Sequence, residues 1–263
     1  EEQREELQST ITRLVVEWST EWQMLFNSSK CHILHLGLRN AEYEYTMGGT
    51  ALEVVEYEKD VGVIVHRSLK PSMQCSKAAA RANGILGQLS RAVSYRDRVT
   101  FLKLYKVYVR PHLEYAVVSW SPWTVGDKEV LERVQRRALR MVSNLRGRTY
   151  EARLEEVGMT SLEDRRVRGD MITTYRIMTG KDKVDPGHFF DLVADGLGPR
   201  TRGVTGVYNI RGVNDRLEIR KNSFSQRVVT TWNSLPDSLR GVGTVLGFKI
   251  GYDEWVSRGR LGA

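Results

Sequence analysis

The hydrophobic positions of the first 66 residues change from a helical to a strand-like spacing. Residues 5–25 carry apolar side chains three and four positions apart, which predicts a helix that ends at the Asn-Ser-Ser sequence of 27–29. Residues 31–36 and 60–65 are typical of strands. The alternating residues around Gly48-Gly49 predict a hairpin. We therefore expect a helix followed by a small antiparallel sheet.

From Pro71 to residue 148 the spacing is helical. Proline suits the first turn of a helix, and a single apolar stripe follows it: Ala78, Ala82, Ile85, Leu86, Leu89 and Val93. Residues 96–120 are apolar on nearly every face, which predicts the buried member of a helical bundle. We expect a kink or a break at Pro111, because proline lacks a backbone donor and clashes with the preceding turn. Asp127 is a candidate cap for the next helix.

The helix predicted over residues 127–145 separates apolar and cationic positions most sharply. At about 100° per residue, its apolar side chains share one arc: Leu131, Val134, Ala138, Met141, Val142 and Leu145. The opposite side carries four arginines: Arg133, Arg136, Arg137 and Arg140. Glu129 and Glu132 can pair with two of them at helical spacing but cannot neutralise the row. One face is thus predicted to pack and the other to present guanidinium groups.

The last third also predicts helices. Ser161 and Asp164 have capping-box spacing before a stripe of four apolar residues: Met171, Ile172, Tyr175 and Met178. Short strands are expected near 204–219, and two further helical segments at 223–235 and 245–256. Trp232 is expected to be a core residue, with Pro236 closing its helix.

The charge of the chain is unevenly distributed. Residues 1–66 carry a net charge of −7, residues 67–148 carry +12 and residues 149–263 carry +3, within a total of +8. These segments are the three predicted domains of an α+β protein. A middle segment this basic favours a polyanionic partner, most simply nucleic acid, and Lys77, Arg81 and Arg91 add a second basic strip beside the arginine row. A solvated outer face of a helical bundle is the alternative.

Few residue patterns suggest catalysis or metal binding. The sequence has no phosphate loop, nucleophile elbow or zinc helix, and two cysteines are too few for a disulfide framework. Cys31 and His35 would share one face of a strand while His32 points away, so a metal site there is not expected. With no signal segment or membrane span, an intracellular location, in cytoplasm or nucleus, is expected.

Seven stretches resemble the C-terminal part of non-LTR retrotransposon (LINE, jockey-like) reverse transcriptases. They follow the order of that family: WSTEWQMLFNSSKCHILHLG, YEKDVGVIVHRSLK, LYKVYVRPHLEYAVVSWSP, LERVQRRALRMV, YEARLEEVGMTSLEDRRVRGDMITTYRIM, RTRG and FSQRVVTTWNSLP. The resemblance implies the end of a polymerase palm in residues 1–66, a basic helical thumb in 67–148 and a mostly helical region in 149–263. It also implies RNA or an RNA/DNA hybrid as the partner, with no membrane and no small-molecule substrate.

The same resemblance assigns roles to individual residues. Lys30 matches the palm lysine that donates a proton to departing pyrophosphate, a role left vestigial here, and Val61 with Gly62 matches the element that holds the primer end. The thumb-like basic residues are Lys77, Arg81, Arg91, Arg133, Arg136, Arg137 and Arg140, expected to contact phosphates without reading sequence.

The paired aspartates that hold two Mg²⁺ ions in the family lie upstream of the matching stretches, and this sequence contains no Asp-Asp dipeptide. The chain is therefore expected to bind template and primer without polymerising or holding a cofactor, whereas a full-length parent would be an RNA-directed DNA polymerase. The alternative is a host-retained or decaying fragment that acts as a helical protein-interaction module or has no activity.

Overall fold

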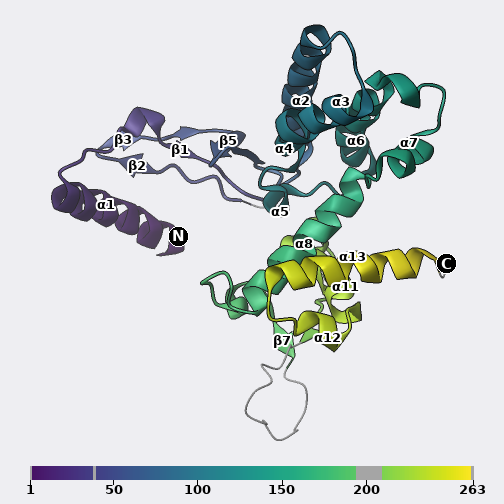
Figure 1. The fold of residues 1–263 in the computed structure, drawn as a ribbon. Coiled ribbons are helices and arrows are strands. Elements are labelled where there is room, and N and C mark those ends of the chain that lie inside the picture. The colour runs from purple at the N-terminus through teal and green to yellow at the C-terminus, as the bar shows by residue number, and fades with distance from the viewer. Residues whose placement is uncertain (1, 38–39, 194–208, 262–263) are drawn as a thin grey trace, which may run out of the picture. The chain divides into compact units, whose positions relative to one another are not determined.

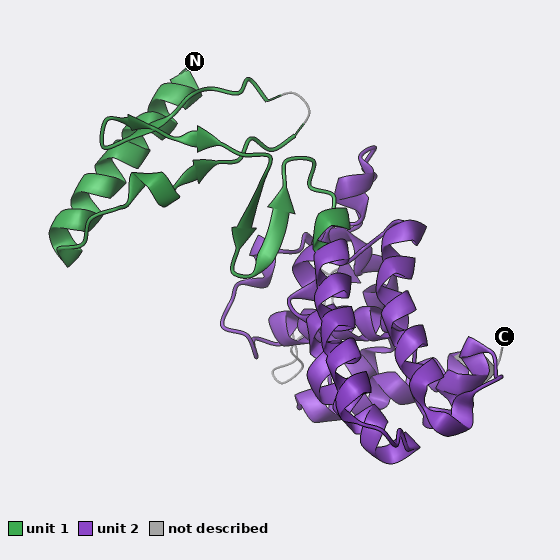
Figure 2. Ribbon diagram, turned by 90° about the horizontal axis from the view of Figure 1, so that it is seen from above, with its two compact units in different colours: residues 1–74 green, residues 75–263 purple. Residues whose placement is uncertain are grey.

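The structure, a computed structural model, describes residues 2–37, 40–193 and 209–261. It divides the chain into two compact units, residues 1–74 and residues 75–263 (Figure 2). Helices dominate the described residues, together with four two-stranded sheets (Figure 1), which confirms the predicted α+β class. Within the described ranges, no helix combines the length and the apolar character that crossing a membrane requires.

Unit 1 contains one long helix and several very short strands. Its elements are α1 (Glu2–Trp22), η1 (Ser28–Lys30), β1 (His32–Ile33), β2 (Thr46–Met47), β3 (Thr50–Ala51), β4 (Glu53–Val54), β5 (Tyr57–Asp60) and β6 (Val63–His66). β2 and β3 form the predicted antiparallel hairpin, and Gly48 and Gly49 take positive φ angles of 58° and 79° in its turn. β1 pairs with β4 in parallel, so this sheet differs from the antiparallel arrangement expected.

The predicted strand at 60–65 is instead half of a second hairpin. β5 and β6 pair antiparallel, with Asp60 opposite Val63, and Val61 and Gly62 form the turn between them. Both turn residues have positive φ, 42° for Val61 and 87° for Gly62. The continuous apolar run concealed the turn because valine is an unfavourable residue for this backbone region.

α1 packs loosely within its unit. None of its residues is buried, and Leu7, Leu14 and Trp22 are 48%, 53% and 60% exposed. Gln8 attaches the helix to β2 through two 2.9 Å hydrogen bonds with the backbone of Thr46. Of the residues described in this unit, only His35, Ile64, Pro71 and Gln74 are buried, so unit 1 has very little hydrophobic core.

Unit 2 is a helical assembly with one small sheet. Its first elements are α2 (Ser72–Ala92), which begins at the end of unit 1, α3 (Arg98–Leu104), η2 (Tyr105–Val109), α4 (Arg110–Glu114), α5 (Val117–Trp120), α6 (Val125–Met141), η3 (Ser143–Leu145) and α7 (Tyr150–Val157). They are followed by α8 (Leu162–Met178), η4 (Pro186–His188), β7 (Leu192–Val193), β8 (Asn209–Ile210), α9 (Glu218–Lys221), α10 (Phe224–Arg227), α11 (Val229–Ser234), α12 (Asp237–Arg240) and α13 (Val245–Leu261). The predicted boundary at 148/149 lies inside this unit.

The α-helix is interrupted next to Pro111, where a kink or a break was expected. The π-helical turn η2 precedes it, where the backbone N–H of Arg110 donates to the carbonyl of Tyr105. Proline then lies in the first turn of α4, where its missing donor costs least. A second break follows at Ala116, whose φ of 49° separates α4 from α5. The wider turn absorbs the proline because a five-residue hydrogen bond removes the crowding of the regular helix.

Two predicted helix caps have different outcomes. The hydroxyl of Ser161 accepts a 3.0 Å hydrogen bond from the backbone of Asp164, which confirms this cap of α8. The cap of α6 is Thr124 and not Asp127: the threonine hydroxyl accepts from the Asp127 backbone N–H at 3.1 Å and donates to its carboxylate at 2.8 Å. Asp127 thus occupies the third helical position of a capping box.

The C-terminal part of unit 2 has its own hydrophobic cluster. Trp232 is fully buried, which confirms it as a core residue, and α11 ends just before Leu235 and Pro236. Tyr175 of α8 stacks on Phe248 of α13 with ring centroids 4.3 Å apart. Helices far apart in sequence are joined through this aromatic packing.

Candidate nucleic-acid interface

One face of α6 is cationic and exposed, and the other is packed. Arg133, Arg137 and Arg140 are exposed, and Arg136 is half-buried. The opposite face buries Leu131, Val134 and Ala138 of the predicted apolar stripe. α6 ends at Met141, before the predicted end at residue 145, so the buried Val142 and Leu145 follow the helix. The packed stripe fixes the rotation of the helix about its axis and therefore directs the arginines outward.

Contacts within unit 2 hold two of the four arginines in place. Arg136 pairs with Glu129 at 2.5 Å, and its guanidinium lies 4.9 Å from the ring centroid of Tyr150. Arg137 donates a 3.1 Å hydrogen bond to the side chain of Asn83, so α2 and α6 are neighbours. Arg133 and Arg140 have no carboxylate within 4.0 Å among the described residues, and their charges are available to a partner.

The second basic strip lies on α2. Lys77, Arg81 and Arg91 are exposed, and none has an ion-pair partner among the residues that the structure describes. The pKa of His112 is lowered by burial and then by the positive charge of Arg81. The nearby imidazole therefore responds to the positive potential of this strip.

The acidic residues of the basic segment take part in internal contacts. Asp97 caps α3 by accepting from the backbone of Thr100 at 2.9 Å, and Asp127 and Glu132 are buried. Glu114 pairs with arginines of α4 and α8, and Glu129 pairs within α6. These carboxylates leave the outer surface of α2 and α6 dominated by cations.

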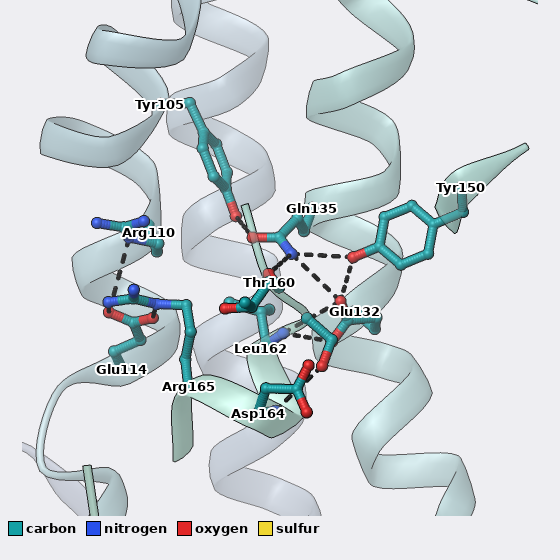
Figure 3. A network of polar contacts seen from close by, with 11 residues as sticks. Tyr105, Arg110, Glu114, Glu132, Gln135, Tyr150, Thr160, Leu162, Asp164 and Arg165 are labelled. Carbon is teal, nitrogen blue, oxygen red and sulfur yellow. Dashed lines mark hydrogen bonds and ion pairs between the residues drawn. The ribbon is translucent and has the colours of Figure 1, made fainter. Parts of the chain in front are cut away.

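A buried polar network attaches the packed side of α6 to the turn before α8 (Figure 3). The carboxylate of Glu132 accepts the backbone N–H of Leu162 at 3.0 and 3.2 Å and the hydroxyl of Tyr150. Gln135 is fully buried: its amide donates to the carbonyl of Thr160 at 3.1 Å and accepts from the hydroxyl of Tyr105 at 2.9 Å. Each polar group of the network has a buried hydrogen-bond partner, and these bonds fix the orientation of α6 relative to the start of α8.

Burial controls the ionisation of this network. It raises the pKa of Tyr105 and of Tyr150, so both phenols remain hydrogen-bond donors. Arg166 is 4% exposed, and burial lowers its pKa, while the charges of surrounding groups, first among them Glu132 and then Glu163, act in the opposite direction.

No protein-family model, curated protein or solved structure matches this chain. The roles assigned to individual residues through the resemblance therefore remain predictions.

The residues that the resemblance assigns to a palm belong to unit 1. Lys30 is the exposed last residue of η1, and Val61 and Gly62 are exposed at the tip of the β5–β6 hairpin. The RTRG sequence at 200–203 lies outside the described residues. His32 pairs with Glu58 at 2.7 Å whereas His35 is buried, and the described residues contain no group of His, Cys, Asp and Glu side chains arranged to hold a metal ion.

Sequence reasoning did not identify the buried network. Glu132 and Glu129 look alike in sequence because both lie at helical spacing from an arginine, yet only Glu132 is buried. The available signal was Gln135: an amide next to the apolar arc of an amphipathic helix requires buried partners. Those partners lie 15 to 30 residues away in sequence, beyond the reach of helical periodicity.

Proposed function

We propose that this chain is a C-terminal part of a non-LTR retrotransposon reverse transcriptase whose α2–α6 surface binds RNA or an RNA/DNA hybrid. The observation that carries the proposal is the row of exposed arginines on α6, a helix whose opposite face is fixed by a buried network. Guanidinium groups form bidentate hydrogen bonds with phosphate. A rigid row of them suits a regularly spaced polyanion.

The geometry of α6 supports binding along a nucleic-acid backbone. Arg133 and Arg140 are separated by seven residues, which corresponds to about 10 Å along a helix axis. Contacts of this kind position a duplex without selecting its sequence, because phosphates are the same at every base pair. Polymerisation is not part of the proposal: the Mg²⁺-binding aspartates would belong to a full-length parent.

The test is a filter-binding titration of an RNA/DNA hybrid between about 50 and 200 mM salt. The quadruple variant Arg133→Glu/Arg136→Glu/Arg137→Glu/Arg140→Glu should lose most of its affinity, and the dependence of log K on log salt should flatten by about 0.9 for each lost phosphate contact. A milder triple variant, Arg133→Gln/Arg137→Gln/Arg140→Gln, spares the packed Arg136 and should shift both quantities in the same direction.

A matched control distinguishes the effect of the arginine row from the effect of net charge. Lys181, Lys183, Arg216 and Lys221 are exposed on other parts of unit 2, and replacing all four with glutamate changes the formal charge equally. The control should retain most of the affinity. Equal losses in the two quadruple variants would show that the protein binds as any basic protein does, and the alternative of an interaction module or an inactive fragment would then be favoured.

A further inference from the structure

A pocket of about 570 Å³ opens in unit 2 on a side of the bundle that shares no residue with the α2–α6 surface. Its walls come from η2, α4, the turn before α8, α8 itself and α13. This volume lies within the usual range of small-molecule sites, about 300 to 1,000 Å³. The π-helical turn that contributes Lys106 to the wall is an element often found at functional sites.

Four cations line the pocket, Lys106, Arg110, Arg165 and Arg168, against the lining carboxylates Asp164 and Asp253 and the adjoining Glu114. Arg110 and Arg165 share the carboxylate of Glu114. Arg110 lies 3.7 Å from this carboxylate, and Arg165 donates two hydrogen bonds to it, one of 3.0 Å (Figure 3). The pKa of Arg110 is lowered by burial and then by the charge of Arg165. Two adjacent guanidinium groups with one counterion favour the approach of a further anion.

The other charged groups of the wall differ in their pairing. Arg168 forms a bidentate pair with Asp253, at 2.6 and 2.8 Å, which joins α8 to α13 and frames the pocket. Lys106 has no carboxylate within 4.0 Å in the part of the chain that the structure describes. Its ammonium group and the shared guanidinium of Arg110 are therefore the positive charges with the least compensation.

The remaining wall is mixed: Thr160, Ser257 and the carboxylate of Asp164 are polar, and three further side chains are apolar. Met159, Val167 and Val256 line the pocket, and Val167 is 38% exposed. A simple inorganic anion would leave this surface uncovered, whereas a ligand that joins a phosphate to a flat, partly apolar group would use both parts.

We propose that this pocket binds a nucleotide unit, with the phosphate held by Lys106 and Arg110 and the nucleoside lying against Met159, Val167 and Val256. Glu114 alone cannot balance both Arg110 and Arg165, and a bound phosphate would supply the missing negative charge. The phosphate can also accept bidentate hydrogen bonds from a guanidinium. The nucleotide unit has two possible sources with the same chemistry: a free nucleoside monophosphate, or the 5′-phosphorylated end of a nucleic-acid strand.

The first experiment is isothermal titration calorimetry of the full chain with adenosine 5′-monophosphate, inorganic phosphate and adenosine. We expect the monophosphate to bind most tightly, phosphate more weakly, and adenosine more weakly by at least about tenfold because charge-assisted hydrogen bonds are lost. Lys106→Gln and Arg110→Gln should each weaken binding of the monophosphate by about tenfold or more. Lys103→Gln, an exposed change one turn earlier and outside this pocket, should leave the affinity unaltered.

The proposal would be overturned by the absence of any heat of binding at millimolar monophosphate, or by the same dissociation constant in the parent, Lys106→Gln and Arg110→Gln proteins. Lys106→Gln keeps the test decisive even if Arg110→Gln fails to fold, because Lys106 takes part in no described ion pair. Adenosine binding as tightly as its monophosphate would also contradict phosphate recognition.

A second measurement identifies the source of the nucleotide unit. Affinities are compared for one oligonucleotide carrying either a 5′-phosphate or a 5′-hydroxyl, in the parent and in Lys106→Gln. A preference for the phosphorylated strand that disappears in Lys106→Gln assigns the pocket to strand ends, and equal affinities together with monophosphate binding assign it to free nucleotide. The quadruple glutamate variant of α6 should still bind the monophosphate, so failure of the proposed duplex binding and failure of this pocket are distinguishable.

Discussion

Replacing Glu132 with alanine tests whether the buried network fixes α6. The carboxylate accepts the backbone N–H of Leu162, the hydroxyl of Tyr150 and the amide of Gln135, the last at 3.3 Å. Its removal leaves buried donors unsatisfied, at about 1–3 kcal/mol.

We therefore expect Glu132→Ala to lower the free energy of unfolding by about 1–3 kcal/mol. Urea titration monitored by tryptophan fluorescence measures it, since Trp120 and Trp232 are buried in unit 2. Glu129→Ala is the matched control, one turn earlier on the same helix: its partly exposed pair with Arg136 contributes about 0–1 kcal/mol.

A Glu132→Ala protein that unfolds within about 0.5 kcal/mol of the parent would refute the reasoning, since surface substitutions away from such networks have effects of that size. It would mean that the apolar stripe alone orients α6. Glu132→Gln adds a second comparison: it keeps one oxygen acceptor and removes the charge, so its effect should fall between those of the parent and the alanine variant.

Three further predictions concern single residues. Burial raises the pKa of Cys75 from 9.0 to about 12. In a Cys31→Ser protein, iodoacetamide at pH 8 should therefore modify Cys75 only after unfolding, and the free energy of unfolding should fall as pH rises from about 9 to 12. Fast modification of the folded protein would contradict this prediction. The pKa of His112 is lowered by burial and by the charge of Arg81, so the neutral imidazole's contribution to stability is lost as pH falls below the ordinary histidine pKa of 6.5. Arg81→Gln should raise the pKa of His112 in an NMR titration. An unchanged titration midpoint would show that burial alone acts. Val61→Asn should stabilise the β5–β6 hairpin by about 1 kcal/mol, because asparagine tolerates the positive φ of 42° at this position. Val63→Asn, in the neighbouring strand, should destabilise the hairpin. Thermal unfolding measures both effects.

Some elements could be predicted from residues close together in sequence. The Gly48-Gly49 hairpin, the cap at Ser161 and the two faces of α6 depend on backbone preferences or on a period of 3.6 residues, and both are local properties. The turn at Val61-Gly62 was missed for the same reason, since strand preference dominates a short apolar run.

The sequence by itself determined the cationic row: the order of residues in 127–145 places arginines opposite apolar side chains in any helix. Only the tertiary structure decided that Glu132 is buried while Glu129 is partly exposed, and that Arg110 and Arg165 share Glu114 beside a pocket. Periodicity gives the face of a helix on which a residue lies. Which neighbour covers that face depends on contacts between distant segments, and burial sets the strength of the resulting charge interactions.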